Sequence, residues 1–364
     1  TPKPSSAASD VYKRQYLHPA LDRENLTIRK EVTVNRLVLR SSKVVAVDYI
    51  RDGQAYSVDV SLEVIVCAGS VNSPKLMMLS GIGDETVLRN VGIKPYHHLP
   101  SVGRYLQDHL DIYICHKSDT TLTKTPALRW YNRCKAAFQW FATKTGDAAT
   151  NHFEALCYLR SSDELARPNI LSWFCPILVN PDGSSMGYPH GYFLMLMQQR
   201  PTSRGFVSLR TSKPTDPPII SAQFLSDKED LKVLREAVRV GRKVLSQPAF
   251  QRFRGTEISP GACVITDQQI DNYVRQSAKS TRHPSCTCRM GIDPVTSVVD
   301  SEARVHGLEG VRIVDASIMP QIVGGALNAT TIMLAEKLAD CILHNSPEPP
   351  LMEEALVARQ TRAT

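Results

Sequence analysis

Short runs of β-branched and aliphatic residues fill the first part of the chain and predict β-strands there. These runs cover residues 26–28, 33–39, 44–47 and 62–66. The last run leads through Cys67, Ala68 and Gly69 into a predicted short helix over residues 73–79, with Pro74 among its initial helical residues. The start of the chain therefore predicts strands followed by a helix.

The middle and the end of the chain mix strand and helix patterns. Residues 206–209 and 218–220 are predicted strands, and residues 227–245 carry the period of a helix. A strand over 311–314 follows, and a helix is expected to begin at Asn328 and to end near Leu343. The pattern by itself predicts only a protein of mixed α and β structure.

One predicted helix has an unusually aromatic face. Seven apolar residues share this face: Ala127, Trp130, Tyr131, Cys134, Ala137, Phe138 and Phe141. Such a stripe most often packs on its own domain, and this is the expectation here. The second interpretation is contact with a membrane surface.

Composition narrows the class of protein. The chain has 364 residues, of which 42% are hydrophobic and 22% charged, as in globular proteins that bury a sizeable core. The net charge of +7 is spread along the chain without a long basic run, so no nucleic-acid partner is expected. No apolar stretch approaches the roughly 18 residues of a spanning helix. Nine scattered cysteines favour buried thiols in a reducing compartment over a disulfide framework.

Two polar side chains near the C-terminus combine a base with a hydrogen-bond donor. His283 opens the block His-Pro-Ser-Cys-Thr-Cys-Arg-Met-Gly, and Asn328 opens Asn-Ala-Thr-Thr. An imidazole can take a proton from an alcohol near neutral pH, and an amide can stabilise the resulting alkoxide. Each also has an ordinary structural interpretation, since a lone histidine is more often structural and an asparagine before a helix is typically an N-cap.

These blocks carry a resemblance to the glucose-methanol-choline (GMC) oxidoreductases. Residues 69–83 match the second signature of that family at every fixed position, and residues 283–291 and 314–340 are similar to its C-terminal flavin and catalytic blocks. The sequence of residues 304–310, 315–320 and 328–331 is especially similar to the choline dehydrogenase branch. The resemblance runs from about Tyr16 to about Leu343.

The resemblance implies an α/β (mixed α+β) fold in two parts. A partial FAD-binding domain is expected over residues 16–109, a substrate-binding domain with an antiparallel sheet over 110–285, a returning FAD-binding segment over 286–344, and a disordered tail over 345–364. The Gly-x-Gly-x-x-Gly turn that holds the FAD pyrophosphate in the family is missing, which predicts an N-terminally truncated chain. The alternative function is therefore an inactive fragment unable to hold FAD.

The resemblance also implies the chemistry, which is oxidation of a choline-like or other primary alcohol to an aldehyde, with hydride transfer to flavin N5. His283 is implied as the base and Asn328 as its catalytic partner. FAD is the implied cofactor, and its expected binding residues are Val34, Ala68, Gly69, Asp315, Ala316, Ala329 and Thr330. For Ala68 and Gly69, a tight turn without a ligand is the competing interpretation.

The residues and the resemblance also indicate candidate substrate residues and partners. Glu154 and His190 are candidate substrate residues, and Arg282 beside His283 tells against an ammonium substrate such as choline. The resemblance implies a small alcohol substrate and a quinone or membrane-associated electron acceptor. It implies a cytoplasmic location or one peripheral to an inner membrane, bacterial or mitochondrial.

Three other motifs are set aside. The spacing of His283, Cys286 and Cys288 could suggest zinc, but no further ligand completes a closed site, so no metal is expected. Residues 183–187 match the Gly-x-Ser-x-Gly elbow of serine hydrolases without the helix that should follow. The loop histidines His97, His98 and His109, with Asp108, are expected to take no part in catalysis.

Overall fold

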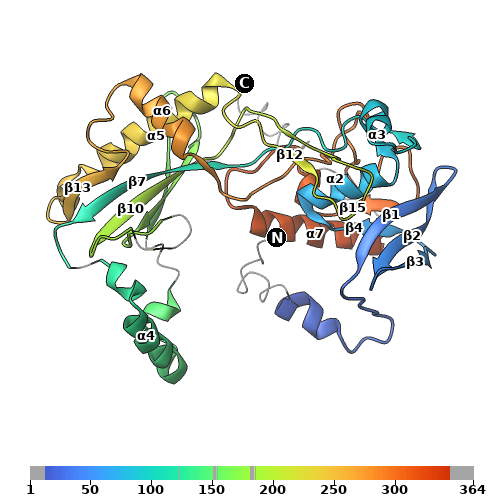
Figure 1. The fold of residues 1–364 in the computed structure, drawn as a ribbon, viewed down its shortest axis with the longest axis horizontal. Helices are drawn as coiled ribbons and strands as arrows, with labels where there is room; N and C mark the ends of the chain where they lie inside the picture. Colours follow the sequence, from blue (N-terminus) through green and yellow to red (C-terminus); the bar gives the residue numbers. More distant parts are fainter. Residues whose placement is uncertain are drawn as a thin grey trace, which may run out of the picture.

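Two lobes, joined by strand β7 and neighbouring segments, make up the computed structural model of the chain (Figure 1). The structure describes residues 13–344 apart from residues 122, 151–152, 154, 181–183 and 185. The predicted disordered tail over 345–364 therefore lies outside the described residues.

The first lobe contains an antiparallel sheet, a parallel strand pair and helices between them. Its elements are β1 (Thr33–Arg40), β2 (Lys43–Arg51), β3 (Gln54–Asp59), β4 (Val64–Val66), α2 (Gly69–Leu79), β5 (Ile82–Gly83), α3 (Glu85–Asn90), β6 (His97–His98), β15 (Val311–Ile313) and α7 (Leu327–His344). Strands β1, β2 and β3 pair in sequence order, and β15 returns from far along the chain to pair in parallel with β4. The predicted strand over 26–28 is absent, and β3 was not predicted.

Helix α2 differs from its predicted form at Pro74. The helix begins at Gly69, so Pro74 lies inside it rather than at its start. A proline has no N–H to donate to the carbonyl four residues earlier, which here belongs to Ser70. The hydroxyl of Thr287 donates to that carbonyl oxygen at 2.6 Å and replaces the missing donor. The C-terminal block therefore supports α2 through a hydrogen bond from a distant part of the sequence.

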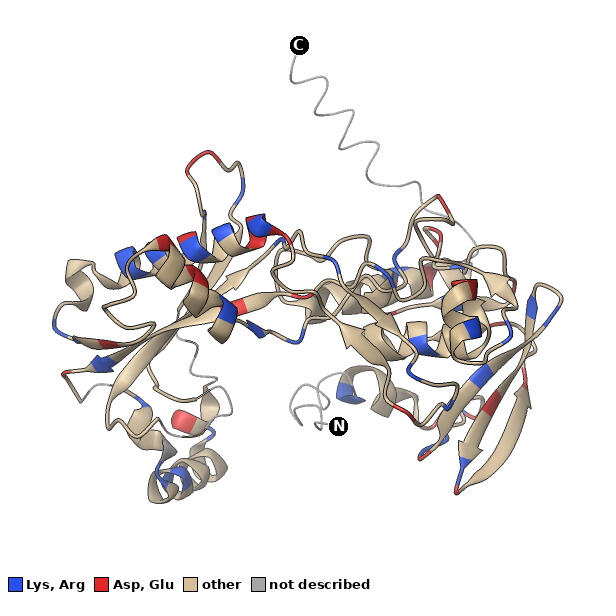
Figure 2. Ribbon diagram, turned by 45° about the horizontal axis from the view of Figure 1, so that its top comes forward, with Lys and Arg blue, Asp and Glu red and all other residues tan. Residues whose placement is uncertain are grey.

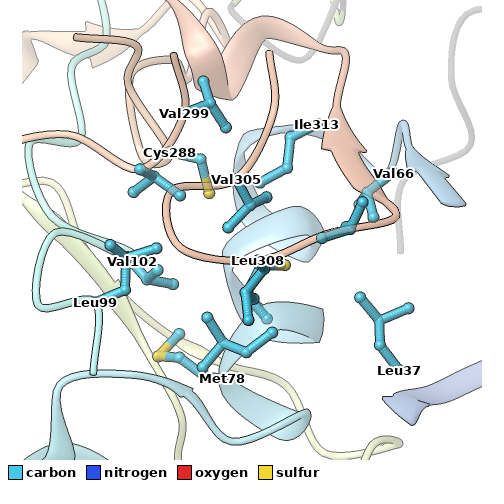
Figure 3. Packing of buried hydrophobic residues seen from close by; sticks show 14 of the residues in the cluster. Leu37, Val66, Met78, Leu99, Val102, Cys288, Val299, Val305, Leu308 and Ile313 are labelled. Atoms are coloured by element: carbon cyan, nitrogen blue, oxygen red, sulfur yellow. The ribbon is translucent and has the colours of Figure 1, made fainter. Parts of the chain in front are cut away.

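A cluster of buried side chains forms the core of the first lobe. It brings together Leu37 from β1, Val66 from β4, Met78 from α2 and Ile313 from β15. Figure 3 shows these side chains with Val305 and Leu308 around α2. This core fixes the ends of β4 and β15 relative to the start of α2.

The second lobe is built on an antiparallel sheet with the order β13-β7-β10-β9-β8, in which β14 also pairs with β7. Its elements are β7 (Leu110–Ser118), α4 (Trp130–Thr143), β8 (Ala155–Leu159), β9 (Ile170–Cys175), β10 (Gly191–Gln198), α5 (Lys228–Leu245), β13 (Arg254–Ser259), α6 (Asp267–Ser277) and β14 (Lys279–Ser280). The predicted helix over 227–245 is α5, with Asp227 as its N-cap.

Alternation along β7 and β10 divides this sheet into two faces. Ile112, Ile114, Leu194 and Leu196 lie on one face and pack against α5 and α6, which cover it in Figure 1. The residues between them on each strand point to the opposite face. That opposite face is therefore available to form a cavity.

Helix α4 contradicts the expectation that its aromatic stripe packs on its own domain. None of its described residues is buried, and Trp130, Phe138 and Phe141 are 76%, 76% and 77% exposed. Figure 1 shows the helix projecting from the second lobe. Ala127 lies in a separate 3-10 turn (Thr125–Leu128), and the other six residues of the stripe lie in α4. Periodicity alone does not specify what covers the face of a helix.

A hairpin within the predicted substrate domain packs on the other lobe. Strands β11 (Phe206–Ser208) and β12 (Ile219–Ser221) pair with each other, and β11 lies against α2. The ammonium group of Lys75 in α2 donates to the carbonyl oxygens of Pro214 and Asp216 at 2.6 and 2.7 Å. The predicted bounds at residues 109/110 and 285/286 stay a prediction, and this hairpin belongs structurally with the first lobe.

Charged residues of both signs are interspersed over both lobes (Figure 2). This distribution agrees with the charge pattern of the sequence, which lacks a long basic run. Among the described helices, none combines the length and the apolarity that crossing a bilayer requires.

Candidate active site

A short segment at residues 279–285 carries His283 and lies along the start of β7. Lys279 pairs with Asp111, and Ser280 with Leu110. Further along, Ser285 and Gln107 exchange main-chain hydrogen bonds of 2.9 and 3.2 Å. Between these contacts, Arg282 has a left-handed φ of 65°, a conformation that a long side chain rarely adopts. The segment therefore turns locally at Arg282 and presents His283 next to β7.

The imidazole of His283 contacts two side chains through one nitrogen. Its Nδ1 lies 3.0 Å from Nδ1 of His109 and 3.0 Å from Oγ1 of Thr281. The rings of His283 and His109 meet edge to face, with centroids 5.2 Å apart. Burial lowers the pKa of His283 below its ordinary value, so the ring is neutral near pH 7.

A buried carboxylate anchors the main chain at His283. The main-chain N–H of His283 donates to Oδ1 of Asp108 at 2.8 Å, and the Ser280 hydroxyl donates to the other carboxylate oxygen. Asp108 and His109, which sequence analysis set aside, thus both contact His283 directly. Their sequence gives no local signal for this, because the contacts join residues more than 170 positions apart.

His283 lies in the wall of a cavity of about 520 Å³ on the open face of the second-lobe sheet. The lining residues are Asp111, Tyr113, Phe153, Trp173, Met195, Lys279, Ser280, Thr281, Arg282, His283 and Ala326. Strand pairing places Tyr113 and Trp173 on either side of Met195, on the same face as Asp111 and Lys279. The volume suits a small-molecule ligand.

Asp111 is the carboxylate of this cavity. Its side chain is buried, its Oδ2 accepts a hydrogen bond from the Tyr113 hydroxyl at 3.2 Å, and its Oδ1 has no partner among the described residues. Burial raises the pKa of Asp111 to about 6. A buried carboxylate oxygen that faces a cavity and has no hydrogen-bond partner can be satisfied by a cationic or hydrogen-bond-donating ligand.

Asn328 lies at the start of α7, but not as the predicted N-cap. The helix begins at Leu327, which is buried in an apolar cluster with Cys286 and Met319, so Asn328 falls in the first turn. The side chain is exposed. The cavity wall includes Ala326, two residues earlier, and does not include Asn328 itself.

Four of the seven predicted cofactor residues lie together at one edge of the first lobe. Ala68 and Gly69 follow the C-terminal end of β4, and Asp315 and Ala316 follow that of β15, its parallel partner. Carboxyl ends of parallel strands are where open α/β sheets bind ligands. Asp315 joins the two turns, since its carboxylate accepts from the main-chain N–H groups of Gly69 at 2.9 Å and Ser317 at 2.8 Å.

This edge fits a flavin nucleotide. Gly69 has a φ of 82°, and a Cβ placed on it would meet no atom within 4 Å, so space is open beside the start of α2. Ala68 and Ala329 are exposed beside the first turns of α2 and α7. The main-chain N–H groups of Ala68 and Gly69 donate to Ser73 Oγ and to the Asp315 carboxylate, whereas the first N–H groups of α7 have no partner within the helix. Val34 on β1 is 40% exposed, which leaves it accessible to a ligand.

Of the two candidate substrate residues, the structure places only His190, and it does not bring that residue to His283. Glu154 lies outside the described residues. His190 precedes β10 and lies 3.1 Å from Oγ1 of Thr123 through its Nδ1. His190 is adjacent to Gly191, which pairs with Lys117 near the end of β7 opposite Asp111. His190 therefore lies roughly 20 Å from Asp111 along the strand. Asp111 in the cavity was missed, although a lone carboxylate within the apolar run 110–114 was an available signal.

The motifs that were set aside have ordinary surroundings. Cys286 and Cys288 are buried in two different apolar clusters, and burial raises the pKa of both thiols. The described part of the chain holds no group of three or more potential metal ligands. In the serine-hydrolase pentapeptide, Ser185 lies outside the described residues, and strand β10, not a helix, follows.

Comparison with family models decides the relationship. The N-terminal model described as GMC oxidoreductase matches residues 7–111, and the C-terminal model with the same description matches residues 201–335. The chain belongs to the GMC oxidoreductase family. The family and the mixed fold with an antiparallel sheet, both predicted from the sequence, are confirmed. FAD is the cofactor that membership of this family indicates.

The chain is similar to curated members of this family over nearly its whole length. It is 41% identical to the oxygen-dependent choline dehydrogenase of Pectobacterium carotovorum over 349 residues, which cover 96% of this chain and 62% of that protein. It is 42% identical to the enzyme of the same name from Acinetobacter baumannii over 332 residues, covering 90% of this chain and 60% of that protein. The chain thus spans somewhat over half the length of these relatives.

Solved structures share the fold. Pyridoxine 4-oxidase from Mesorbium loti is 27% identical with a TM-score of 0.77, over 90% of this chain and 60% of that one. A FAD-dependent oxidoreductase from Chaetomium thermophilum is 23% identical with a TM-score of 0.82, over 92% and 64%. Both comparisons place the two lobes within one known architecture.

Proposed function

We propose that this chain carries the proton-accepting site and part of the cofactor edge of a FAD-dependent enzyme that oxidises a primary alcohol to an aldehyde. The observation that supports this most directly is the His283 imidazole, which lines the 520 Å³ cavity and has a pKa below its ordinary value because it is buried. FAD, when bound, supplies the acceptor for the hydride that leaves the carbinol carbon. The hydride, which carries the electron pair of the broken C–H bond, and the hydroxyl proton therefore go to two different acceptors.

Residues of the chain itself would accept the proton, stabilise the alkoxide and hold the cofactor. His283 would accept the hydroxyl proton, and the amide of Asn328, two residues after the cavity-wall residue Ala326, would donate a hydrogen bond to the developing alkoxide oxygen. The main chains of the turns at Ala68–Gly69 and Asp315–Ala316 would lie against the cofactor, and the main-chain N–H groups of Ala329 and Thr330 would donate to it from the positive end of α7. Val34 would contribute a main-chain contact to the adenine.

Choline is one candidate substrate, because the relatives at 41% and 42% identity are named choline dehydrogenases. The cavity supports an ammonium group through the Asp111 carboxylate and the aromatic rings of Tyr113 and Trp173. Lys279 and Arg282 in the same wall oppose it. The cavity wall thus carries charges of both signs beside its aromatic rings.

Replacing Asp111 by asparagine tests the role of this carboxylate. We expect kcat/KM for choline to fall about 5- to 30-fold, the loss of roughly 1–2 kcal/mol of charge interaction. The uncharged analogue with a tert-butyl group in place of trimethylammonium should change by less than about twofold. Steady-state kinetics with both alcohols measures this. Equal losses for the two alcohols would show that Asp111 supports the cavity without recognising charge.

The first experiment on function is the visible absorption spectrum of purified residues 1–364. A flavin spectrum, followed by bleaching when a primary alcohol is added without oxygen, is the expected result. A colourless protein that stays colourless after incubation with FAD would contradict the proposal and favour the alternative, a folded chain that does not hold the cofactor. Circular dichroism of the same sample shows whether the chain is folded in either case.

The electron acceptor is open to a parallel measurement. Both named relatives are described as oxygen-dependent, which supports oxygen as the acceptor, whereas the family resemblance implied a quinone or a membrane-associated carrier. Oxygen consumption during alcohol oxidation, compared with reduction of a soluble quinone under argon, distinguishes the two.

A further inference from the structure

The buried imidazole of His109 has a defined protonation state. Its Nε2 lies 3.2 Å from the carbonyl oxygen of Gln199 and 3.0 Å from that of Val323. A carbonyl oxygen only accepts hydrogen bonds, so Nε2 must carry the hydrogen. The side chain is fully buried, and burial with the neighbouring His283 lowers the pKa of His109 to about 4. At neutral pH the ring is therefore neutral, and its Nδ1 is an acceptor.

This assignment determines which nitrogen of His283 is protonated. Nδ1 of His109 lies 3.0 Å from Nδ1 of His283, so one of the two atoms must donate, and only His283 can. The Thr281 hydroxyl donates to the carbonyl oxygen of His109 at 3.2 Å, which leaves its own oxygen free to accept from the same N–H at 3.0 Å. Both neighbours thus require a hydrogen on Nδ1 of His283. In the neutral ring, Nε2 then bears the lone pair.

We propose that His109 is a positioning residue that fixes the tautomer of His283, so that Nε2 is the atom that accepts the proton of the alcohol. The inference rests on the proposed function, because it assigns an atom to the base proposed there. It adds a chain of three contacts, from the carbonyl oxygens of Gln199 and Val323 through His109 to His283.

The same contacts suit the product of proton transfer. When Nε2 of His283 takes a proton, its Nδ1–H keeps its bonds to His109 and Thr281, and no neighbour has to rotate. The neutral His109 accepts from the imidazolium, and the Asp108 carboxylate holds the main chain of His283 in place. The other charged groups around the ring are Asp111, Lys279 and Arg282 in the cavity wall. Because the site is preorganised, the transfer requires little rearrangement.

The test compares two substitutions of His109 whose new side chains have similar size and shape to each other. His109→Leu removes the acceptor next to His283, whereas His109→Asn keeps an acceptor oxygen near the position of Nδ1; both lose the donor to the two carbonyl oxygens. Nitrogen-15 spectra of histidine-labelled protein, with His283 assigned from the His283→Gln spectrum, report the tautomer without any cofactor. We expect Nδ1–H in the wild type and in His109→Asn, and a shift towards Nε2–H in His109→Leu.

A second substitution keeps the test decisive if the His109 variants do not fold. Thr281→Val removes the second acceptor, and the Nδ1–H form should persist because His109, whose Nδ1 can only accept, remains. A wild-type spectrum with hydrogen on Nε2, a Nδ1–H form that survives in His109→Leu, or one lost in Thr281→Val would each overturn the inference.

Kinetics separate this inference from the proposed function. If the chain oxidises an alcohol, kcat in His109→Leu should fall about 10- to 100-fold relative to His109→Asn, with KM changed less than about threefold. A chain that holds no flavin would contradict the proposed function and still reveal the tautomer. An active chain whose His283 has the wrong tautomer would contradict the inference alone.

Discussion

Replacement of His283 by alanine is expected to lower kcat by about 100- to 10,000-fold, the usual contribution of a positioned general base. The cavity keeps its other walls, so KM for the alcohol should change by less than about threefold. The imidazole contributes little to the core of either lobe, because it is only half-buried and belongs to neither main apolar cluster. The loss should therefore appear in kcat, as measured by steady-state oxidation and by the anaerobic rate of flavin bleaching.

The pH profile provides a second signature of the same residue. The base must be neutral to accept a proton, and burial holds the pKa of His283 below its ordinary value of 6.5. The rate should therefore rise with pH through a pKa below 6.5 and stay level above it. An uncharged alcohol is the appropriate substrate, because the pKa of Asp111 is about 6 and its ionisation would affect binding of a cation in the same range.

A matched control uses a histidine outside the site. His98 lies in β6 of the first lobe, its side chain is exposed, and it does not line the cavity. His98→Ala should keep the wild-type kcat and pH profile within about twofold. If His283→Ala retained a tenth or more of the wild-type kcat, or kept the low-pH fall in rate, another group would be the base.

Elements with one buried face were predictable from the sequence. Strand β2 and helix α5 bury residues at roughly the expected periods of two and 3.6, and β1, β2 and α5 were predicted to within a few residues of their positions. Strand β3 was missed because all of its residues are exposed, so it has no hydrophobic face to produce a pattern. It forms by main-chain pairing with β2, which leaves little trace in side-chain type.

The candidate site also has parts that the sequence could predict and parts that it could not. His283 could be found because its neighbours along the chain resemble a family motif. Its contacts with Asp108 and His109 could not, because they arise from the pairing of residues 107–111 with 279–285. The N-cap prediction for Asn328 was wrong by a small margin, since the buried Leu327 extends the helix by a residue. The sequence pattern is a better guide to the residues that carry the chemistry than to the residues that surround them in the fold.

The largest stability loss is expected at Asp230, on the first turn of α5. Its carboxylate is buried and accepts four hydrogen bonds, from the Gln198 side chain at 2.7 Å, the Thr202 main chain and hydroxyl at 2.7 and 2.9 Å, and the Ser203 main chain at 2.8 Å. Burial alone would raise the pKa of Asp230, but the hydrogen bonds from Ser203 and Thr202 outweigh it, and the pKa lies below its ordinary value. The carboxylate therefore ties α5 to the end of β10, next to the Gln199 carbonyl that contacts His109.

Asp230→Ala should lower the free energy of unfolding by about 3–5 kcal/mol, because it leaves these buried donors without an acceptor. Asp227→Ala is the matched control, since that residue is the exposed N-cap of the same helix and should cost about 1 kcal/mol. Urea unfolding measures both. Because the folded pKa of Asp230 is depressed, its contribution is present above the unfolded pKa of about 4 and is lost as pH falls through the folded value. Asp230→Asn should therefore show a weaker loss of stability than the wild type on acidification, and equal costs for Asp227→Ala and Asp230→Ala would refute the role of this network.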